Sequence, residues 1–245
     1  MEKIFKILKQ AGQIALEEQK TLKTQVKKDG TIVTNGDLAV SHFLEKEFKI
    51  LFPEYDLFCE ENCSQIPQKE KVIIVDPIDG TQSYNRREDT WCILVGFTEN
   101  LKPTQGFIYQ PVTDKMFYAS KGQGAFLQSP EGTQKLNQAR TGPLKGITSF
   151  KDYGENDFFK KQGIEQVDQM FSAALKIAKI ANGEYDLYPN FQKGCSIWDL
   201  VAPQILLEEA GGTLEFASPT PYQFQTPSLK ERFCAYGARM TPLQW

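Results

Sequence analysis

The chain has 245 residues, of which 40% are hydrophobic and 24% are charged, and its formal net charge is −3. These proportions are typical of a globular protein with a substantial core, and the slight acidity gives no reason to expect a nucleic-acid or membrane surface. A single histidine, His42, excludes a multi-histidine metal site and leaves catalysis to carboxylates, hydroxyls and a metal. The odd number of five cysteines, without paired metal spacing, predicts reduced thiols and a cytoplasmic location.

The first half of the chain reads as two helices followed by strands. Apolar residues at helical spacing predict helices over residues 2–20 and from about Asp37 to Leu51. A basic connection joins them, and its Asn35-Gly36 pair predicts a turn. Apolar runs bounded by Pro and Gly predict strands over residues 55–59, 72–75, 91–98, 106–110 and 116–119.

The second half changes character near residue 142. Helices are predicted over 170–181 and 197–210, and short strands over 185–188, 213–216 and 233–236. This order favours two α/β lobes, residues 1–142 and 143–245, with a site in the crevice between them.

Residues 71–81 read KVIIVDPIDGT and are the most informative stretch. An apolar run delivers Asp76 to the end of a buried strand, where Pro77 is expected to end the pairing and Gly80 permits a tight turn. Asp76 and Asp79 would repel each other in a crowded pocket unless one took a proton or a cation lay between them. Carboxylate oxygens suit Mg²⁺, so the stretch predicts a divalent-metal site that handles phosphate.

Further acidic residues would matter if the fold brought them to the same place. Asp37 and Asp199 each open a predicted helix, where an acidic side chain can also serve as a cap. Glu60 and Glu61 follow a short strand, where solvated loop charge is the simpler interpretation. The residues alone leave both interpretations open for each position.

Together these motifs resemble the inositol monophosphatase superfamily. The resemblance rests on the DPIDGT hexapeptide at residues 76–81, Glu60-Glu61, Val33-Thr34 with Asp37, and Trp198-Asp199 followed by Ala202-Pro203. It runs from about residue 5 to residue 216. It implies an α/β fold, a layered α/β/α/β/α sandwich, and a lithium-sensitive phosphomonoesterase that uses two or three Mg²⁺ ions. The implied partner is a small phosphorylated metabolite, and the chain would be a monomer or a homodimer.

The resemblance also implies roles for single residues. Those implied to hold metal are Glu60, Asp76, the Ile78 carbonyl, Asp79 and Asp199. Thr81 and Glu60 would orient and activate the attacking water, and Asp37 would hydrogen-bond around Thr81. The backbone amides of Gly80 and Thr81 would receive the phosphate, and Asp199 would also contact the substrate.

The substrate is predicted from two segments. Residues 175–189 and 198–212 are similar to the 3′(2′),5′-bisphosphate nucleotidase branch, which acts on adenosine 3′,5′-bisphosphate, a by-product of sulfate assimilation. Lys176 would then contact the retained phosphate, or else be a solvated helix lysine. The alternatives are the same chemistry on inositol 1-phosphate or on a sugar phosphate, as in a fructose-1,6-bisphosphatase, and a catalytically inactive binding protein with the same fold.

Overall fold

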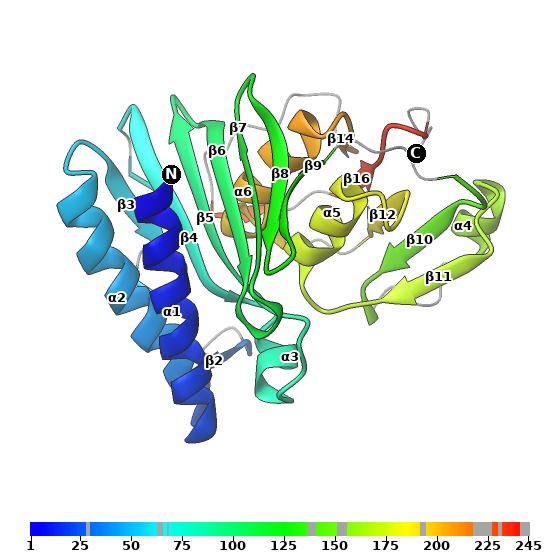
Figure 1. Cartoon of the computed structure of the whole chain (residues 1–245). Helices are drawn as coiled ribbons and strands as arrows, with labels where there is room; N and C mark the ends of the chain where they lie inside the picture. Colours follow the sequence, from blue (N-terminus) through cyan, green and yellow to red (C-terminus); the bar gives the residue numbers. More distant parts are fainter. Residues whose placement is uncertain are drawn as a thin grey trace.

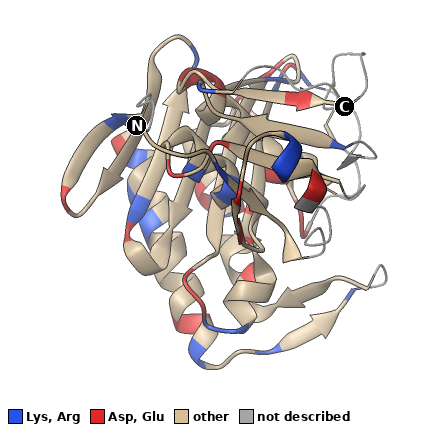
Figure 2. Cartoon of the chain, turned by 90° about the vertical axis from the view of Figure 1, so that its right-hand side faces the viewer, with Lys and Arg blue, Asp and Glu red and all other residues tan. Residues whose placement is uncertain are grey.

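Helices and sheets alternate in five layers in the computed structural model (Figure 1). The structure describes residues 1–27, 30–62, 66–67, 69–136, 141–150, 156–191, 195–217, 227–229 and 232–240. No helix within these ranges is both long and apolar enough to cross a membrane. Lys and Arg segments are interspersed with Asp and Glu segments along the described ribbon, in line with the small net charge (Figure 2).

The outermost layer consists of α1 (Glu2–Lys20) and α2 (Asn35–Leu51). Their apolar residues recur at helical spacing, so each helix turns one buried stripe toward the neighbouring sheet. The hairpin of β1 (Thr24–Val26) and β2 (Ile32–Thr34) connects the two helices. The Asn35-Gly36 pair was predicted as a turn, and this was wrong, because Thr34 caps α2 and both residues lie in its first turn.

The second layer is a seven-stranded sheet. In spatial order its strands are β3 (Asp56–Cys59), β4 (Lys71–Asp79), β5 (Cys92–Glu99), β6 (Lys102–Gln110), β7 (Lys115–Ser120), β8 (Gly124–Ser129) and β9 (Gly132–Leu136). Only β3 and β4 run parallel among these neighbours. Side chains of β4 alternate between the two faces: Ile73 and Val75 pack toward α1 and α2, whereas Val72 and Ile74 pack on the opposite side.

The middle layer consists of α5 (Ala173–Ala181) and α6 (Ile197–Glu209), which pack against each other and against the sheet. Two glycines in the sheet allow α6 to come unusually close. A Cβ atom added at Gly106 would lie 2.4 Å from the Ala202 carbonyl oxygen, and one at Gly96 would lie 2.3 Å from Val201 Cγ1. The start of α6, which carries Asp199, is therefore fixed relative to the sheet.

A five-stranded sheet and a short helix complete the sandwich. In spatial order its strands are β11 (Gln166–Gln169), β10 (Lys145–Thr148), β12 (Leu187–Asn190), β16 (Phe233–Tyr236) and β14 (Thr213–Phe216). Helix α4 (Asn156–Lys161) packs on its outer face through Phe159. The short pieces are α3 (Thr81–Asn85), η1 (Pro111–Thr113) and the pair β13 (Cys195–Ser196) and β15 (Ser228–Leu229).

The layered sandwich implied by the resemblance is confirmed. The predicted helix at residues 170–181 begins only at Ala173, and the predicted strand at 185–188 is displaced to Leu187–Asn190. The predicted division between residues 142 and 143 falls between β9 and β10, which belong to different sheets. Because α5 and α6 share one apolar cluster with both sheets, this division into lobes stays a prediction.

We expect Gly106→Ala to destabilise the fold, because the new methyl group would press on helix backbone that cannot rotate away. The expected loss is about 1–3 kcal/mol of unfolding free energy, measured by urea titration. Gly237→Ala is the matched control, since its Cβ would meet Ile180 Cγ2 at an ordinary 3.5 Å. Equal stability of the two variants would show that α6 can move off the sheet at little cost.

Candidate active site

The two aspartates of the DPIDGT stretch lie together because β4 contains a bulge. Pairing with β5 passes from Asp76 opposite Leu94 to Asp79 opposite Cys92, so β4 holds one extra residue there. In a regular strand, residues three apart point to opposite faces, and the extra residue brings both carboxylates to one side. Pro77 was expected to end the strand, and this was wrong, because a residue without an N–H is accommodated at the bulge.

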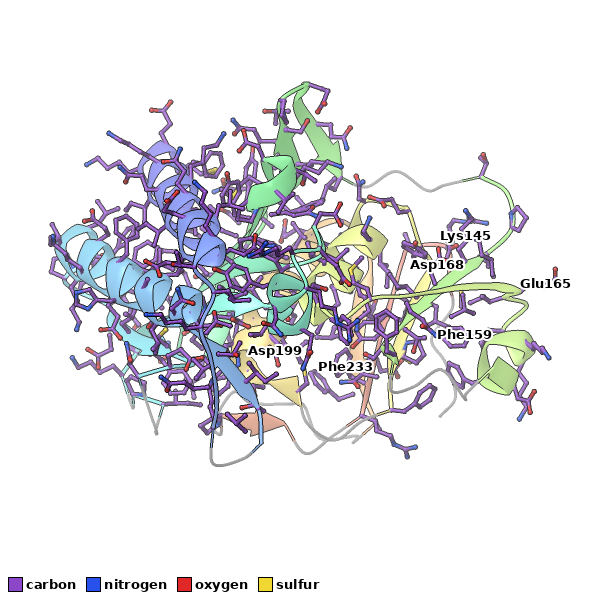
Figure 3. All side chains as sticks on the ribbon, turned by 90° about the horizontal axis from the view of Figure 1, so that it is seen from below. Lys145, Phe159, Glu165, Asp168, Asp199 and Phe233 are labelled. Atoms are coloured by element: carbon purple, nitrogen blue, oxygen red, sulfur yellow. The ribbon has the colours of Figure 1, made fainter. Side chains whose placement is uncertain are left out.

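The third carboxylate comes from the first turn of α6. Asp199 Oδ2 accepts hydrogen bonds from the backbone N–H of Ser196 (2.6 Å) and from the thiol of Cys195 (3.3 Å). The cap interpretation of Asp199 is therefore confirmed. The same side chain also reaches the strand end, where carboxylate oxygens of Asp76, Asp79 and Asp199 lie within 4.8 Å of one another. Asp199 lies in the middle of the molecule, between α2 and the five-stranded sheet (Figure 3).

The carboxylates of this cluster disfavour one another's charge. Burial raises the pKa of Asp76 well above its usual range, and the charges of Glu60 and Asp79 raise it further. Burial and Asp79 raise the pKa of Asp199 to about 7. A divalent cation would remove this repulsion, and three convergent hard oxygen donors fit Mg²⁺. The residues present therefore suit the predicted metal.

Asp79 is held in place by the N-terminus of α5, a contact that the sequence analysis missed. Its Oδ2 atom accepts hydrogen bonds from Ser172 Oγ (2.5 Å) and from the backbone N–H of Ala174 (2.9 Å). Ser172 is fully buried and is the N-cap of the helix. A serine ahead of a helical pattern is a recognisable cap signal, but the partner 93 residues away is not. These bonds orient the Asp79 carboxylate at the end of β4.

Gly80 follows Asp79 at a position where only glycine fits. Its φ of +89° lies in the left-handed region, and a Cβ atom there would approach the Thr90 carbonyl oxygen to 2.9 Å. Thr81 comes next, begins α3, and donates its hydroxyl proton to the Ile78 carbonyl oxygen at 3.1 Å. The turn therefore fixes Thr81 beside two of the predicted metal ligands.

Glu60 lies beside the cluster and forms an ion pair that was not anticipated. Lys27, the residue after β1, contacts Glu60 Oε1 at 3.0 Å and Glu61 Oε1 at 2.7 Å. Burial opposes the charge of Lys27, but the two carboxylates outweigh it and raise its pKa. The solvated-loop interpretation is wrong for Glu61, whose side chain is only 5% exposed. The charge of Glu60 is close enough to raise the pKa of Asp76 and Asp199. The Glu60 carboxylate itself accepts a hydrogen bond from the Lys27 ammonium group.

Asp37 forms the capping box of α2. Its Oδ2 atom accepts hydrogen bonds from the backbone N–H and the hydroxyl of Thr34. Burial raises the pKa of Asp37 to about 7, to which Glu61 and Glu60 contribute. Asp37 and Thr81 were expected to share a hydrogen bond, but the Asp37 carboxylate bonds to Thr34 and the Thr81 hydroxyl bonds to the Ile78 carbonyl. The part that Asp37 plays in catalysis stays a prediction.

Lys176 is fully buried, so the interpretation as a solvated helix lysine is wrong. Its ammonium group donates to Ser149 Oγ (2.7 Å) and to the Met170 carbonyl oxygen (3.1 Å), and lies 4.4 Å from the ring centre of Tyr188. A buried ammonium with these partners orders the segments around the start of α5. Its predicted contact with a substrate phosphate stays a prediction.

The chain belongs to the inositol monophosphatase family, whose profile matches residues 2–234. Members of this family are metal-dependent phosphoric monoester hydrolases, and this chain is an enzyme of that class. The resemblance drawn from the sequence motifs is thereby confirmed.

The similarity to individual relatives extends over most of the chain. A 3′(2′),5′-bisphosphate nucleotidase CysQ from Aggregatibacter actinomycetemcomitans is 29% identical over 229 residues, which are 87% of this chain and 83% of the relative. An inositol monophosphatase from Dictyostelium discoideum is 26% identical over 85% of this chain and 81% of its own. An IMPase structure from Thermotoga maritima has a TM-score of 0.82 at 22% identity, covering 97% of this chain and 93% of that one.

We expect Ser172→Ala to weaken Mg²⁺ binding about tenfold, because the Asp79 carboxylate loses its side-chain hydrogen bond and is oriented by backbone N–H groups alone. Isothermal calorimetry measures the affinity directly, and the dependence of turnover on Mg²⁺ concentration separates it from the rate at saturation. Ser172→Thr keeps a hydroxyl at the same place and should restore most of the affinity. Unchanged Mg²⁺ affinity in Ser172→Ala would refute this positioning role.

Without divalent ions, the stability of the protein should fall between about pH 4 and pH 7. The raised pKa of Asp199, about 7 against 3.8, means that the folded chain holds this proton more tightly than the unfolded chain. The resulting stabilisation is complete below about pH 4 and is lost as the pH rises through about 7. Thermal unfolding of wild type and Asp199→Asn should show a shallower pH dependence in the variant, and identical slopes would contradict the assignment.

Proposed function

We propose that the chain is a Mg²⁺-dependent 3′(2′),5′-bisphosphate nucleotidase that hydrolyses adenosine 3′,5′-bisphosphate to AMP and phosphate. The observation that carries the reaction is the cluster of Asp76, Asp79 and Asp199, whose repulsion is relieved by cations. The choice of substrate is supported by the similarity to bisphosphate nucleotidases. A cytoplasmic location, a role in sulfur metabolism and lithium sensitivity are part of the same proposal.

Two or three Mg²⁺ ions would be held by the predicted ligands, which are Glu60, Asp76, the Ile78 carbonyl, Asp79 and Asp199. When bound, Mg²⁺ lowers the pKa of a water molecule and neutralises the charge of the phosphate. Lys27 already pairs with Glu60, so Glu60 must turn from the ammonium group, or share it, to serve as a ligand.

The remaining steps belong to the chain itself. The Thr81 hydroxyl, fixed by its bond to the Ile78 carbonyl, orients the attacking water, and Glu60 accepts the proton of that water. The amides of Gly80 and Thr81 receive the phosphate oxygens at the turn. Asp37 fixes the start of α2 through its capping hydrogen bonds with Thr34. These groups position the reactants, which is what phosphate-ester hydrolysis chiefly requires.

Lys176 would contact the phosphate that the substrate retains. Its ammonium lies at the start of α5, close enough to Asp79 to affect the pKa of that carboxyl. To reach a phosphate oxygen, it would exchange its bond to the Ser149 hydroxyl for a stronger, charge-assisted one. This makes Lys176 a specificity residue for bisphosphates in the proposal.

The second candidate is an inositol monophosphatase with the same mechanism, because an inositol monophosphatase is nearly as similar to this chain as the nucleotidase is. A sugar phosphatase would use the same residues. The alternative of a catalytically inactive binding protein is set aside, because the chain belongs to a family of phosphoric monoester hydrolases and every predicted metal ligand and Thr81 are present.

Phosphate release by the purified protein with Mg²⁺ distinguishes these candidates. We expect kcat/KM for adenosine 3′,5′-bisphosphate to exceed that for inositol 1-phosphate and fructose 1,6-bisphosphate. Asp79→Asn serves as the control for contaminating phosphatase and should lose activity while keeping its fold, because the change removes a buried charge. Preference for inositol or sugar phosphate would overturn the substrate assignment, and full activity of Asp79→Asn would overturn the metal assignment.

A further inference from the structure

A pair of phenylalanines and an arginine lie beside the start of α5, and none of the roles above uses them. The rings of Phe150 and Phe171 are 4.4 Å apart between centres and inclined by 34°. The guanidinium carbon of Arg86 lies 4.8 Å from the centre of the Phe171 ring. Phe150 is 46% exposed and the Arg86 side chain 54%, so water reaches this aromatic cluster.

Each member of the aromatic cluster is attached to a segment that carries a residue of the active site. Arg86 follows α3, which begins at Thr81. Phe171 directly precedes Ser172, the partner of Asp79. Phe150 directly follows Ser149, the partner of Lys176. The cluster therefore borders the place where the turn at Gly80 meets the start of α5, since a Cβ at Gly80 would lie 3.2 Å from Ser172 Cβ.

The chemistry of the cluster selects among substrates. Exposed aromatic faces stack with planar heterocyclic bases, and such contacts contribute to the binding of single bases by nucleic-acid binding proteins. A guanidinium group binds phosphate with two parallel hydrogen bonds. Arg86 contacts Glu88 only at 3.9 Å, so a phosphate can take its place. Inositol and sugar phosphates have no aromatic face to offer.

We propose that Phe150, Phe171 and Arg86 form the subsite for the leaving group of the substrate, a nucleoside that carries a second phosphate. The base lies against the two phenyl rings, and Arg86 binds the phosphate that is not hydrolysed, at the exposed end of the site. This inference deepens the proposed function and rests on it for the position of the reacting phosphate. It assigns a contact of the second phosphate to the exposed Arg86, beside the contact proposed for the buried Lys176.

Binding of AMP, the product of the proposed reaction, tests the subsite without requiring turnover. Calorimetry in the presence of Mg²⁺ would compare wild type with Phe171→Leu, Phe150→Ala and Arg86→Gln. We expect each ring substitution to weaken AMP binding about tenfold, which corresponds to one stacking contact. Arg86→Gln should weaken binding of AMP more than binding of adenosine. Phe126→Leu is the matched control, because Phe126 stacks on Tyr118 in the first sheet.

Hydrolysis measured beside binding separates the two proposals. Loss of AMP affinity together with a tenfold lower preference for adenosine 3′,5′-bisphosphate over inositol 1-phosphate supports both. If wild type binds AMP through Phe171 but hydrolyses only inositol 1-phosphate, the subsite stands and the proposed substrate is wrong. If wild type does not bind AMP, or if Phe171→Leu and Phe150→Ala bind it as wild type does, the subsite is refuted. Circular dichroism confirms that each variant is folded.

Discussion

The mutual repulsion of Asp76, Asp79 and Asp199 is the constraint around which this fold is arranged. Carboxylate oxygens that lie within 4.8 Å of one another in a protein interior disfavour their own ionisation. Such a cluster would be selected against in a purely structural protein, because it lowers stability at neutral pH. A bound cation would account for the cluster, because it neutralises the three carboxylates, and the chain belongs to a family of metal-dependent phosphatases.

The layers of the sandwich explain how three distant segments meet at one point. The bulge in β4 supplies two carboxylates on one side of the first sheet, and the close approach of α6 at Gly96 and Gly106 brings Asp199 to them. The N-terminus of α5 then binds Asp79 directly. Both helices of the middle layer therefore begin at the site, so its geometry depends on the contact between the two halves of the chain. The aromatic cluster lies at the same junction.

The sequence predicted those elements correctly whose position depends on residues close together in the chain. The helices at residues 2–20 and 197–210, the strands around the metal stretch and the carboxylate pair were all readable from periodicity and spacing. Strand β9 and helix α4 were missed, because β9 is almost fully exposed and α4 has only six residues. The pairs of Lys27 with Glu60 and of Ser172 with Asp79 join residues 33 and 93 positions apart, and local patterns do not encode such contacts. Pro77 shows the opposite error, since the same residue that usually ends a strand can be accommodated in a bulge.

A crystal structure of the protein grown with Mn²⁺ would show directly whether the three carboxylates hold a metal, because Mn²⁺ replaces Mg²⁺ at oxygen sites and can be located by its anomalous scattering. We expect a strong anomalous peak bonded to Asp76, Asp79 and Asp199 together. A protein that hydrolyses phosphomonoesters in the same Mn²⁺ solution but shows no peak at these three carboxylates would contradict this expectation.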